Sequence, residues 1–207
     1  MIISFEGLDG SGKSTQIRML SEKLEMIGKK YTVLREPGGN SISENIRQIL
    51  LDKNNYAIEN ETELLLYIAS RIQLVKNCII PLLNDGNLII LDRFADSTTA
   101  YQGYGRGMDL KVIRFLNNFA TIDGKYMPDI TFFLDMETDA SLSRMESRGE
   151  EINRMESADS EFFKKVRNGF IEISKNEPGR VIRINAANIK EKVFSDIESV
   201  LKERNII

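Results

Sequence analysis

Short runs of apolar, mostly β-branched residues alternate along the chain with longer segments of helical period. Five runs predict strands, at residues 2–5, 31–34, 88–91, 130–134 and 181–184. The run at 88–91 is apolar at every position, which suits a strand covered by helices on both sides. Between the runs, apolar residues recur at intervals of three and four, as at Ile17, Leu20 and Leu24. The alternation predicts an α/β fold with a five-stranded parallel sheet and helices on both faces.

The domain organisation follows from length and from the absence of linker-like sequence. The 207 residues are enough for one sizeable core, and no Pro-, Gly- or Ser-rich linker divides them, so we expect a single domain over residues 1–207. Two segments look irregular: residues 92–108, rich in Gly, Ser, Thr and Tyr, and residues 149–158, polar and charged. These are the candidate functional loops. The apolar segment 61–83 fits a buried helix or part of a subunit interface, and the sequence does not separate the two.

Charge and composition exclude several classes of protein. The net charge of -3 gives no overall positive field for nucleic acid, so no nucleic-acid partner is expected. No basic leader precedes the first apolar residues, and no apolar stretch approaches the roughly 18 residues of a membrane span. We therefore expect a cytoplasmic protein without a membrane partner. With Cys78 as the one cysteine and no histidine, an intrachain disulfide, an ordinary zinc site and a histidine-dependent triad are excluded.

The strongest motif is a complete Walker A pattern at residues 7–14, placed after one predicted strand and before a helical segment. Its glycines let backbone N–H groups turn toward phosphate oxygens, and the helix that follows adds its positive dipole end. Lys13 is positioned to reach the β and γ phosphates, and Ser14 can ligate Mg²⁺. A glycine-rich turn with a surface lysine is the alternative interpretation. The predicted ATP-binding residues are Gly7, Leu8, Asp9, Gly10, Ser11, Gly12, Lys13, Ser14 and Thr15.

A phosphate loop alone leaves open a motor, a GTPase switch, an ATPase or a small-molecule kinase, although the guanine-reading Asn-Lys-x-Asp element is absent. Two further elements follow predicted strands. Arg35 opens the turn Arg-Glu-Pro-Gly-Gly, and Asp92 and Arg93 end the third strand. Ligands of open α/β sheets collect at the carboxyl ends of the strands, where an arginine can bind phosphate and Asp92 can contact Mg²⁺. The alternatives are an ordinary turn with a solvated arginine and an exposed ion pair.

These elements together resemble the thymidylate kinase family. In family order, the chain contains FEGLDGSGKST, REPGG, LYIASR, LDRFADSTTAYQGYGRG and RMESRGEEINRME, which span nearly its whole length. The resemblance implies a phosphate-loop NTPase fold of the nucleoside monophosphate kinase type. It also implies transfer of the γ-phosphoryl group of Mg-ATP to dTMP, giving dTDP and ADP for dTTP synthesis, with Mg²⁺ as cofactor and a homodimeric assembly.

The resemblance also implies roles for individual residues. Asp9 would accept a hydrogen bond from the 3'-hydroxyl of the acceptor, and Tyr67 and Arg71 would read the base by stacking and by donation to a carbonyl oxygen. Tyr67 stands where many relatives have Phe, and the alternative is a core tyrosine and a surface arginine. Arg35 and Arg93 would bind the phosphate, Thr98 would contact the base edge and Tyr101 would crowd the 2' position of the sugar. Ser97 and Gln102 would support this loop. The full set of implied dTMP-binding residues is Asp9, Arg35, Glu36, Pro37, Tyr67, Arg71, Arg93, Ser97, Thr98, Tyr101 and Gln102.

Transition-state charge requires cations, and the resemblance divides this task among Lys13, Mg²⁺ and arginines. Some relatives have an arginine where this chain has Gly10, and members without it use arginines of a lid, here the segment near 144–158. The candidates are Arg144, Arg148 and Arg154. Arg154 is preferred for this role and Arg148 comes next, although a solvated charged helix end is the alternative. The implied catalytic residues are Lys13, Asp9, Arg93, Arg154 and Arg148, and the metal-binding residues are Ser14 and Asp92. We expect residues 149–158 to be mobile without nucleotide.

Two other functions compete with a dTMP kinase. Another nucleotide or deoxynucleoside kinase would share Lys13 and Asp92 but differ at Tyr67, Arg71, Thr98 and Tyr101. A nucleotide-dependent switch would hydrolyse slowly and signal through a partner, without a phosphoryl acceptor. The acceptor-like elements REPGG and DSTTAYQ count against the switch.

Overall fold

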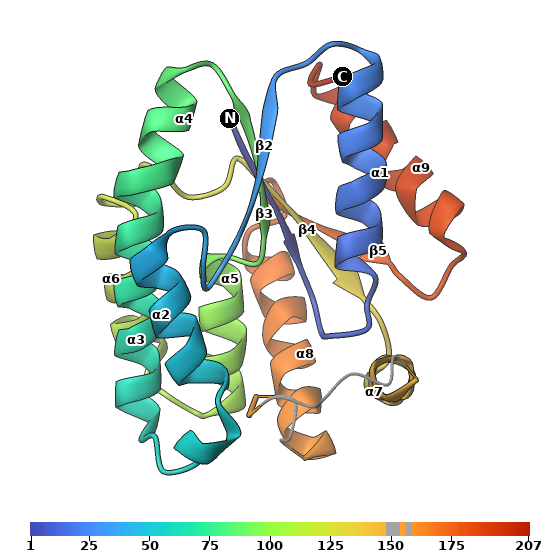
Figure 1. The fold of residues 1–207 in the computed structure, drawn as a ribbon. Helices are drawn as coiled ribbons and strands as arrows, with labels where there is room; N and C mark the ends of the chain where they lie inside the picture. The colour runs from blue at the N-terminus through green and yellow to red at the C-terminus, as the bar shows by residue number, and fades with distance from the viewer. Residues whose placement is uncertain (148–153, 156–158) are drawn as a thin grey trace.

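The computed structural model describes residues 1–147, 154–155 and 159–207, apart from the side chain of Glu146. A five-stranded sheet forms its centre, with the strand order β2-β3-β1-β4-β5 and every pairing parallel (Figure 1). The strands are β1 (Ile2–Glu6), β2 (Tyr31–Arg35), β3 (Leu88–Asp92), β4 (Ile130–Asp135) and β5 (Val181–Asn185). The five predicted strands are confirmed, and each extends one residue farther than its predicted range.

The additional residue of every strand is polar or charged, and these residues mark the functional edge of the sheet. Phe5 of β1 pairs with Asp92 of β3, and Asp92 pairs with Arg35 of β2. Because the strands are parallel, their carboxyl ends lie at the same edge. The chain segments that leave this edge carry the phosphate loop and the Arg35 and Arg93 turns.

Helices cover both faces of the sheet (Figure 1). On one face, Ile3 and Phe5 pack against Leu20 and Ile197 of two helices, and on the other face Ile2 packs against Ile79. The first face carries α1 (Lys13–Met26) and α9 (Lys190–Glu203). The remaining helices are α2 (Ser41–Leu51), η1 (Lys53–Asn55), α3 (Asn60–Leu74), η2 (Val75–Ile79), α4 (Ile80–Asn84), α5 (Ala95–Thr98), η3 (Thr99–Gly105), α6 (Leu110–Ala120), α7 (Thr138–Glu146) and α8 (Ser160–Asn176).

Helix starts follow the expected capping chemistry. Asn40, Asp109 and Asp159 precede α2, α6 and α8, and each side chain accepts a hydrogen bond from a backbone N–H of the first turn, at 3.0, 2.8 and 2.7 Å. α1 instead begins after Gly12, whose φ of 97° is left-handed. The N–H groups at the start of α1 therefore remain available to a ligand.

Residues 92–108 were expected to be irregular, and the structure corrects this: they contain α5 and η3, the second a π-helix. Residues such as Ala100 and Tyr101 are buried against α8, so tertiary packing overrides the weak helix propensity of the sequence. Gly169 of α8 permits the approach, because a Cβ atom there would lie 2.8 Å from the Tyr104 ring. The predicted loop is a fixed part of the core.

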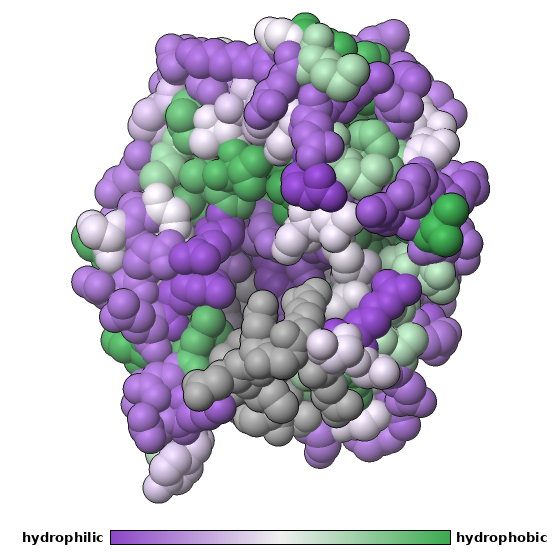
Figure 2. Space-filling view, turned by 45° about the vertical axis from the view of Figure 1, so that its right-hand side comes forward, coloured by the Kyte–Doolittle hydropathy of each residue, from purple (hydrophilic) through white to green (hydrophobic). Residues whose placement is uncertain are grey.

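Residues Asn60–Asn84 form one continuous helix of 25 residues from α3, η2 and α4. By length and composition this helix could cross a membrane, which corrects the expectation that no apolar stretch approaches a span. Leu74, Val75 and Ile79 pack against the sheet, and the same helix carries Glu63 and Arg71 in buried polar networks. We interpret it as a core helix. Figure 2 shows one face of the molecule, which is hollowed near its middle and carries hydrophilic residues with smaller hydrophobic areas between them.

Candidate active site

The phosphate loop connects β1 to α1 and is held tightly against β4. Gly7, Gly10 and Gly12 have φ values of 137°, 84° and 97°. A Cβ atom on Gly7 would lie 2.6 Å from the carbonyl oxygen of Leu134, so the loop has no room for a side chain at this position. The glycine pattern of the sequence therefore corresponds to a real steric requirement.

Lys13 lies inside this loop. Its Nζ donates to the carbonyl oxygens of Gly7 at 3.2 Å and Leu8 at 3.0 Å, and lies 3.7 Å from Asp9 Oδ1. Burial, followed by the nearby charge of Arg93, lowers the pKa of Lys13 to about 8. An ammonium group in such an environment gains strongly from a nearby anion such as a phosphate.

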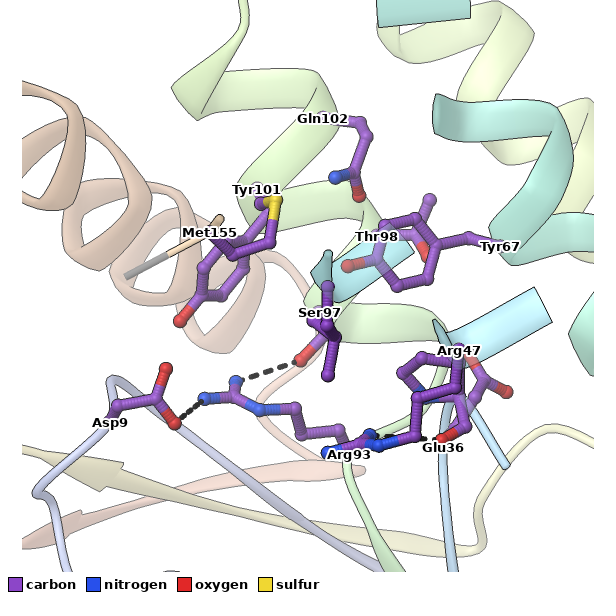
Figure 3. Close-up of a pocket in the computed structure, with 12 residues that line it drawn as sticks. Asp9, Glu36, Arg47, Tyr67, Arg93, Ser97, Thr98, Tyr101, Gln102 and Met155 are labelled. Carbon is purple, nitrogen blue, oxygen red and sulfur yellow. Dashed lines mark hydrogen bonds and ion pairs between the residues drawn. The ribbon is translucent and has the colours of Figure 1, made fainter. Parts of the chain in front are cut away.

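Arg93 joins the third strand to the phosphate loop at this edge of the sheet. Its guanidinium donates to Asp9 Oδ1 at 2.7 Å, to the carbonyl oxygen of Gly7 at 2.9 Å and to Ser97 Oγ at 3.2 Å (Figure 3). It also lies over the Tyr101 ring, 5.2 Å from the ring centre. The φ of Arg93 is 68°, a left-handed value that a non-glycine residue adopts only when its surroundings enforce it. The turn after β3 thus aims this side chain at the phosphate loop.

Two adjoining cavities share these residues. The larger, which we call the tyrosine pocket, encloses about 670 Å³ and is lined by Asp9, Glu36, Pro37, Arg47, Leu51, Tyr67, Arg93, Ser97, Thr98, Tyr101, Gln102 and Met155 (Figure 3). The second, the loop pocket, encloses about 490 Å³ and is lined by Asp9, Gly10, Gly12, Lys13, Ser14, Arg35, Glu36, Arg47, Asp92 and Arg93. Asp9, Glu36, Arg47 and Arg93 line both. The structure therefore brings together the predicted acceptor residues, except for Arg71, around two connected cavities.

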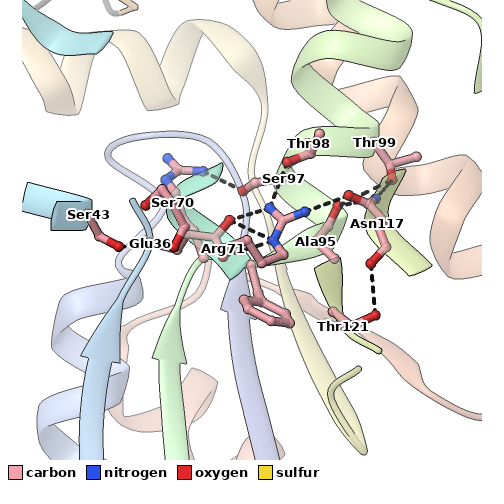
Figure 4. A network of polar contacts seen from close by, with 12 residues as sticks. Glu36, Ser43, Ser70, Arg71, Ala95, Ser97, Thr98, Thr99, Asn117 and Thr121 are labelled. Atoms are coloured by element: carbon pink, nitrogen blue, oxygen red, sulfur yellow. Dashed lines mark hydrogen bonds and ion pairs between the residues drawn. The ribbon is translucent and has the colours of Figure 1, made fainter. Parts of the chain in front are cut away.

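Arg71 lies behind the wall of the tyrosine pocket, with no exposed surface. It donates to both carboxylate oxygens of Glu36, to Thr98 Oγ1 at 2.7 Å and to Asn117 Oδ1 at 2.5 Å (Figure 4). Its guanidinium lies over the Phe94 ring at 5.1 Å. In this arrangement Arg71 supports two residues that line the pocket, and its implied contact with a base stays a prediction.

Arg47 is a site residue that the sequence analysis missed. It projects from α2, donates to the carbonyl oxygen of Pro37 at 3.0 Å and lines both pockets. Burial, followed by the charge of Arg35, lowers its pKa. No motif marks Arg47. The available signal was its position on the helix that follows the Arg35 turn, since such a helix starts from the functional edge of the sheet.

The lid arginines divide between the described and undescribed parts of the chain. Arg148 and most of the predicted lid lie outside the described residues. Arg154 donates to Glu63 Oε2 at 2.6 Å and to the carbonyl oxygen of Leu50 at 2.7 Å. Glu63 also accepts from Gln102 at 2.9 Å, so these contacts hold Arg154 at the Gln102 end of the tyrosine pocket, whereas Asp9 lies at the other end (Figure 3).

The residues predicted to bind Mg²⁺ fit a magnesium site. The Ser14 hydroxyl and the Asp92 carboxylate both line the loop pocket beside Lys13. Among the described residues, no group of three or more His, Cys, Asp or Glu side chains could hold a metal. This agrees with Mg²⁺, which keeps several waters and takes few protein ligands when it is bound with phosphates.

A third cavity, which we call the side pocket, adjoins the other side of the phosphate loop. It encloses about 780 Å³ and lies between the start of α1, α7 and the turn that leads into α9. The predicted ATP-binding residues Ser11, Gly12 and Thr15 line it. Arg144 of the predicted lid segment also lines it, and the remaining lining residues, which were not predicted, are Gln16, Ala186, Asn188, Ile189, Lys190, Glu191 and Val193.

A parallel sheet with a phosphate loop after β1, and with arginines from neighbouring strand ends facing that loop, defines a phosphate-loop kinase of the nucleoside monophosphate kinase type. The family model described as Thymidylate kinase matches residues 5–197. The chain belongs to the thymidylate kinase family.

Comparisons with individual relatives support the same family assignment. Thymidylate kinase from Kosmotoga olearia is 45% identical over 203 residues, covering 98% of this chain and 94% of the relative. Thymidylate kinase from Pelodictyon phaeoclathratiforme is 45% identical over 212 residues, covering 99% and 96%. The crystal structure of thymidylate kinase from Ehrlichia chaffeensis has a TM-score of 0.77 and 35% identity, with 98% of each chain covered. The similarity extends over the whole fold rather than the phosphate loop alone.

Proposed function

We propose that the protein transfers the γ-phosphoryl group of Mg-ATP to dTMP, giving dTDP and ADP for dTTP synthesis. The observation that carries this proposal is the common wall of the tyrosine pocket and the loop pocket. A nucleotide with its base in the tyrosine pocket places its phosphate beside Arg93 and Arg47, next to Lys13 and the phosphate loop. Two substrates held in this way react within one complex, and such positioning can lower a barrier by about 7 to 11 kcal/mol.

On the donor side, the ATP phosphates lie in the loop of residues 7–15, and Lys13 contacts the β and γ groups. Ser14 and Asp92 hold Mg²⁺, which neutralises phosphate charge when bound. The side pocket takes the adenosine portion, because it adjoins Ser11, Gly12 and Thr15 on the side of the loop away from Arg93. Three regions of the chain therefore bind the base, the phosphates and the metal of the donor separately.

On the acceptor side, Tyr67 stacks on the thymine ring and Thr98 contacts the base edge. Burial raises the pKa of Tyr67 and of Tyr101, so both hydroxyls stay protonated. Tyr101 crowds the 2' position, and Asp9 exchanges its Arg93 partner for the 3'-hydroxyl. Arg35, Arg93 and Arg47 bind the acceptor phosphate, with Glu36, Pro37, Ser97 and Gln102 completing the wall.

The chemistry needs no general base. A phosphate monoester is mostly dianionic at neutral pH, its second pKa being about 6, so its oxygen can attack directly. The chain's own task is to hold that oxygen in line with the γ-phosphorus and to stabilise the spread charge. The contacts of Arg154 favour an acceptor-side role for it, which leaves Arg148 and Arg144 as the candidate lid arginines for the transferred group.

We further propose that the protein is a cytoplasmic homodimer. α6 carries Phe115, 67% exposed, and Phe119, 61% exposed, one turn apart, and the exposed Val112 lies about one turn before Phe115. Leu65 of α3, the helix that packs against α6, is also exposed. Exposed aromatic residues grouped in this way are typical of a subunit interface.

The test of the proposed reaction is coupled ADP release with Mg-ATP and each of dTMP, dUMP, dCMP, dGMP, UMP and no acceptor. A rate that depends strongly on dTMP supports the proposal. Preference for another acceptor indicates a different nucleotide kinase, and equal turnover without acceptor leaves a phosphate-loop NTPase of another kind.

A further inference from the structure

Glu6, the last residue of β1, is a buried carboxyl group that the proposed mechanism does not use. Its side chain has no exposed surface and connects the two sides of the active site. Oε1 accepts a hydrogen bond from the Phe94 backbone N–H at 2.7 Å, and Oε2 lies 2.5 Å from Ser97 Oγ. Glu6 precedes the phosphate loop, whereas Phe94 and Ser97 follow Arg93, so this side chain joins the loop to the arginine turn.

The charges around Glu6 are unequally distributed. Asp96 of α5, a second buried carboxylate, receives two hydrogen bonds from Arg180 at 2.7 and 2.8 Å and one from Thr131 at 2.9 Å. Within the described ranges, no Lys or Arg forms an ion pair with Glu6. The cations that face it are Arg93, already paired with Asp9, and Lys13.

A buried carboxylate without an ion-pair partner is costly, so the proton belongs on Glu6 rather than on Asp96. Burial first and the charge of Asp96 second raise the pKa of Glu6 to about 8, against the opposing effects of Ser97, Arg93 and the Phe94 N–H. An ionised Glu6 accepts the short bond from Ser97, whereas a Glu6 that keeps its proton donates it.

We propose that Glu6 is a positioning residue that keeps a proton and uses it to fix the Ser97 hydroxyl as a donor into the tyrosine pocket. A serine oxygen has two lone pairs. Glu6 and the Arg93 guanidinium, 3.2 Å from Ser97 Oγ, occupy both of them. The hydrogen of Ser97 then has to point elsewhere, and Ser97 lines the pocket beside Arg93. Ionised Glu6 would instead take that hydrogen for itself.

This inference rests on the proposed function for its ligand, because the hydrogen of Ser97 faces the position proposed for the acceptor phosphate. The protonation of Glu6 itself does not depend on any activity. The two ideas can therefore fail separately, and the experiments below distinguish them.

The first experiment measures the proton directly. In protein with ¹³C-labelled glutamate, carboxyl NMR signals are followed from pH 5 to 9, and the Glu6 signal is assigned by its loss in Glu6→Gln. We expect an un-ionised carboxyl at pH 7 that ionises near pH 8. A Glu6 signal that is already ionised at pH 7 would overturn the proposal, whatever reaction the protein catalyses.

The second experiment compares KM for dTMP with kcat as the pH rises. Glu6→Gln reproduces the protonated acid, since its amide oxygen accepts from Phe94 and its NH₂ donates to Ser97. We expect its KM at pH 7 to stay within about threefold of wild type, whereas Ser97→Ala raises KM about tenfold through one lost bond to a charged group. Between pH 7 and 9 the KM of wild type rises relative to that of Glu6→Gln. Glu6 is one of the charges that act on the pKa of Lys13, so KM for ATP is measured over the same pH range to separate the titration of Lys13 from that of Glu6.

Asp129→Asn is the matched control. Asp129 also accepts a hydrogen bond from a backbone N–H of β1, that of Ile2 at 2.7 Å, but at the opposite end of the strand. This variant should keep the pH dependence of wild type. Two results for folded Glu6→Gln would contradict the proposal. The first is a KM for dTMP at pH 7 that is tenfold higher than in wild type, and the second is a KM that rises with pH as it does in Asp129→Asn.

Discussion

Two arginine–carboxylate pairs lie at the same edge of the sheet and differ in their access to solvent. In the Arg71–Glu36 pair the side chains are 0% and 3% exposed, whereas in the Arg93–Asp9 pair they are 17% and 29% exposed. The first pair is enclosed by Thr98, and its partners are fixed. The second pair opens into both pockets. The Arg71–Glu36 pair is therefore a permanent part of the site's wall, whereas a substrate can replace the partners in the Arg93–Asp9 pair.

The largest effect is expected from Arg93→Ala. The guanidinium faces the position of the acceptor phosphate, so kcat/KM for dTMP should fall by about 10³-fold, within the range measured for the loss of one preorganised charged donor. The free energy of unfolding should change little, because Asp9 remains exposed to water. Steady-state kinetics and thermal unfolding of the same preparation give both values. Arg93→Lys, which keeps the charge without the fork, serves as the control and should recover only part of the activity.

Arg71→Ala should mainly lower the free energy of unfolding, the quantity that Arg93→Ala leaves nearly unchanged. It leaves Glu36 buried without a partner, which costs about 3 to 5 kcal/mol of unfolding free energy. Burial already raises the pKa of Glu36 against the effect of Arg71.

The double variant Arg71→Met with Glu36→Gln removes the unpaired charge and should recover most of the lost stability. Glu36 lines both pockets, so Glu36→Gln alone is the control. If the double variant is stable and binds ATP in calorimetry but loses dTMP binding that Glu36→Gln keeps, direct reading of the base by Arg71 is favoured over a supporting role.

Arg47→Ala tests the residue without a motif. Loss of one charged contact to the acceptor phosphate should raise KM for dTMP about tenfold and leave ATP affinity unchanged. Arg18→Ala is a suitable control, since Arg18 is an exposed arginine that pairs with Glu22 on α1. Equal changes in dTMP and ATP binding would show that Arg47 belongs to the donor side.

A smaller effect is expected from pH. The pKa of Lys13 is lowered from 10.5 to about 8 in the nucleotide-free protein, so the ammonium charge is lost as the pH rises through 8. Bound phosphates favour the charged form, and ATP affinity should therefore weaken several-fold between pH 7.5 and 9.5, as measured by calorimetry. Lys13→Arg does not titrate in this range and should show no such trend.

The smallest effect on the chemistry is expected at the apolar face of α6, which lies outside both arginine pairs. Phe115→Glu places a charge where we propose a subunit contact and should convert a dimer to a monomer in sedimentation experiments. The exposed Tyr56, 85% exposed on the segment after η1, offers the control Tyr56→Glu. A monomeric wild-type protein would remove the proposed interface.

The strands and the phosphate loop could be predicted because their signals are local. A buried parallel strand is apolar at most of its positions, as at 88–91, and the loop needs glycine at positions with positive φ. The Arg93 turn was found because a charged pair ends a buried strand. In each case one short segment carries the whole constraint.

What the sequence did not reveal depends on packing between distant segments. Arg71 and Arg47 are both arginines on helices, and the sequence does not show that Asn117 and Glu36 enclose the first while the second reaches the pockets. Likewise, the helix at 95–105 forms because α8 covers it, although its composition is that of a loop. Arg154 was expected near the transferred group, and its bond to Glu63 spans 91 positions in sequence.

The π-helix η3 has a consequence for tolerance of insertions and deletions. Gly, Ser and Thr around it suggest a stretch that could lose or gain a residue freely. In the structure, Tyr101 and Gln102 line the tyrosine pocket, and Arg106, one residue beyond η3, bonds to Glu63. A one-residue deletion inside η3 would rotate all that follows about the helix axis relative to what precedes. This segment should therefore behave as an element of fixed length, and length variation should be confined to the turns outside it.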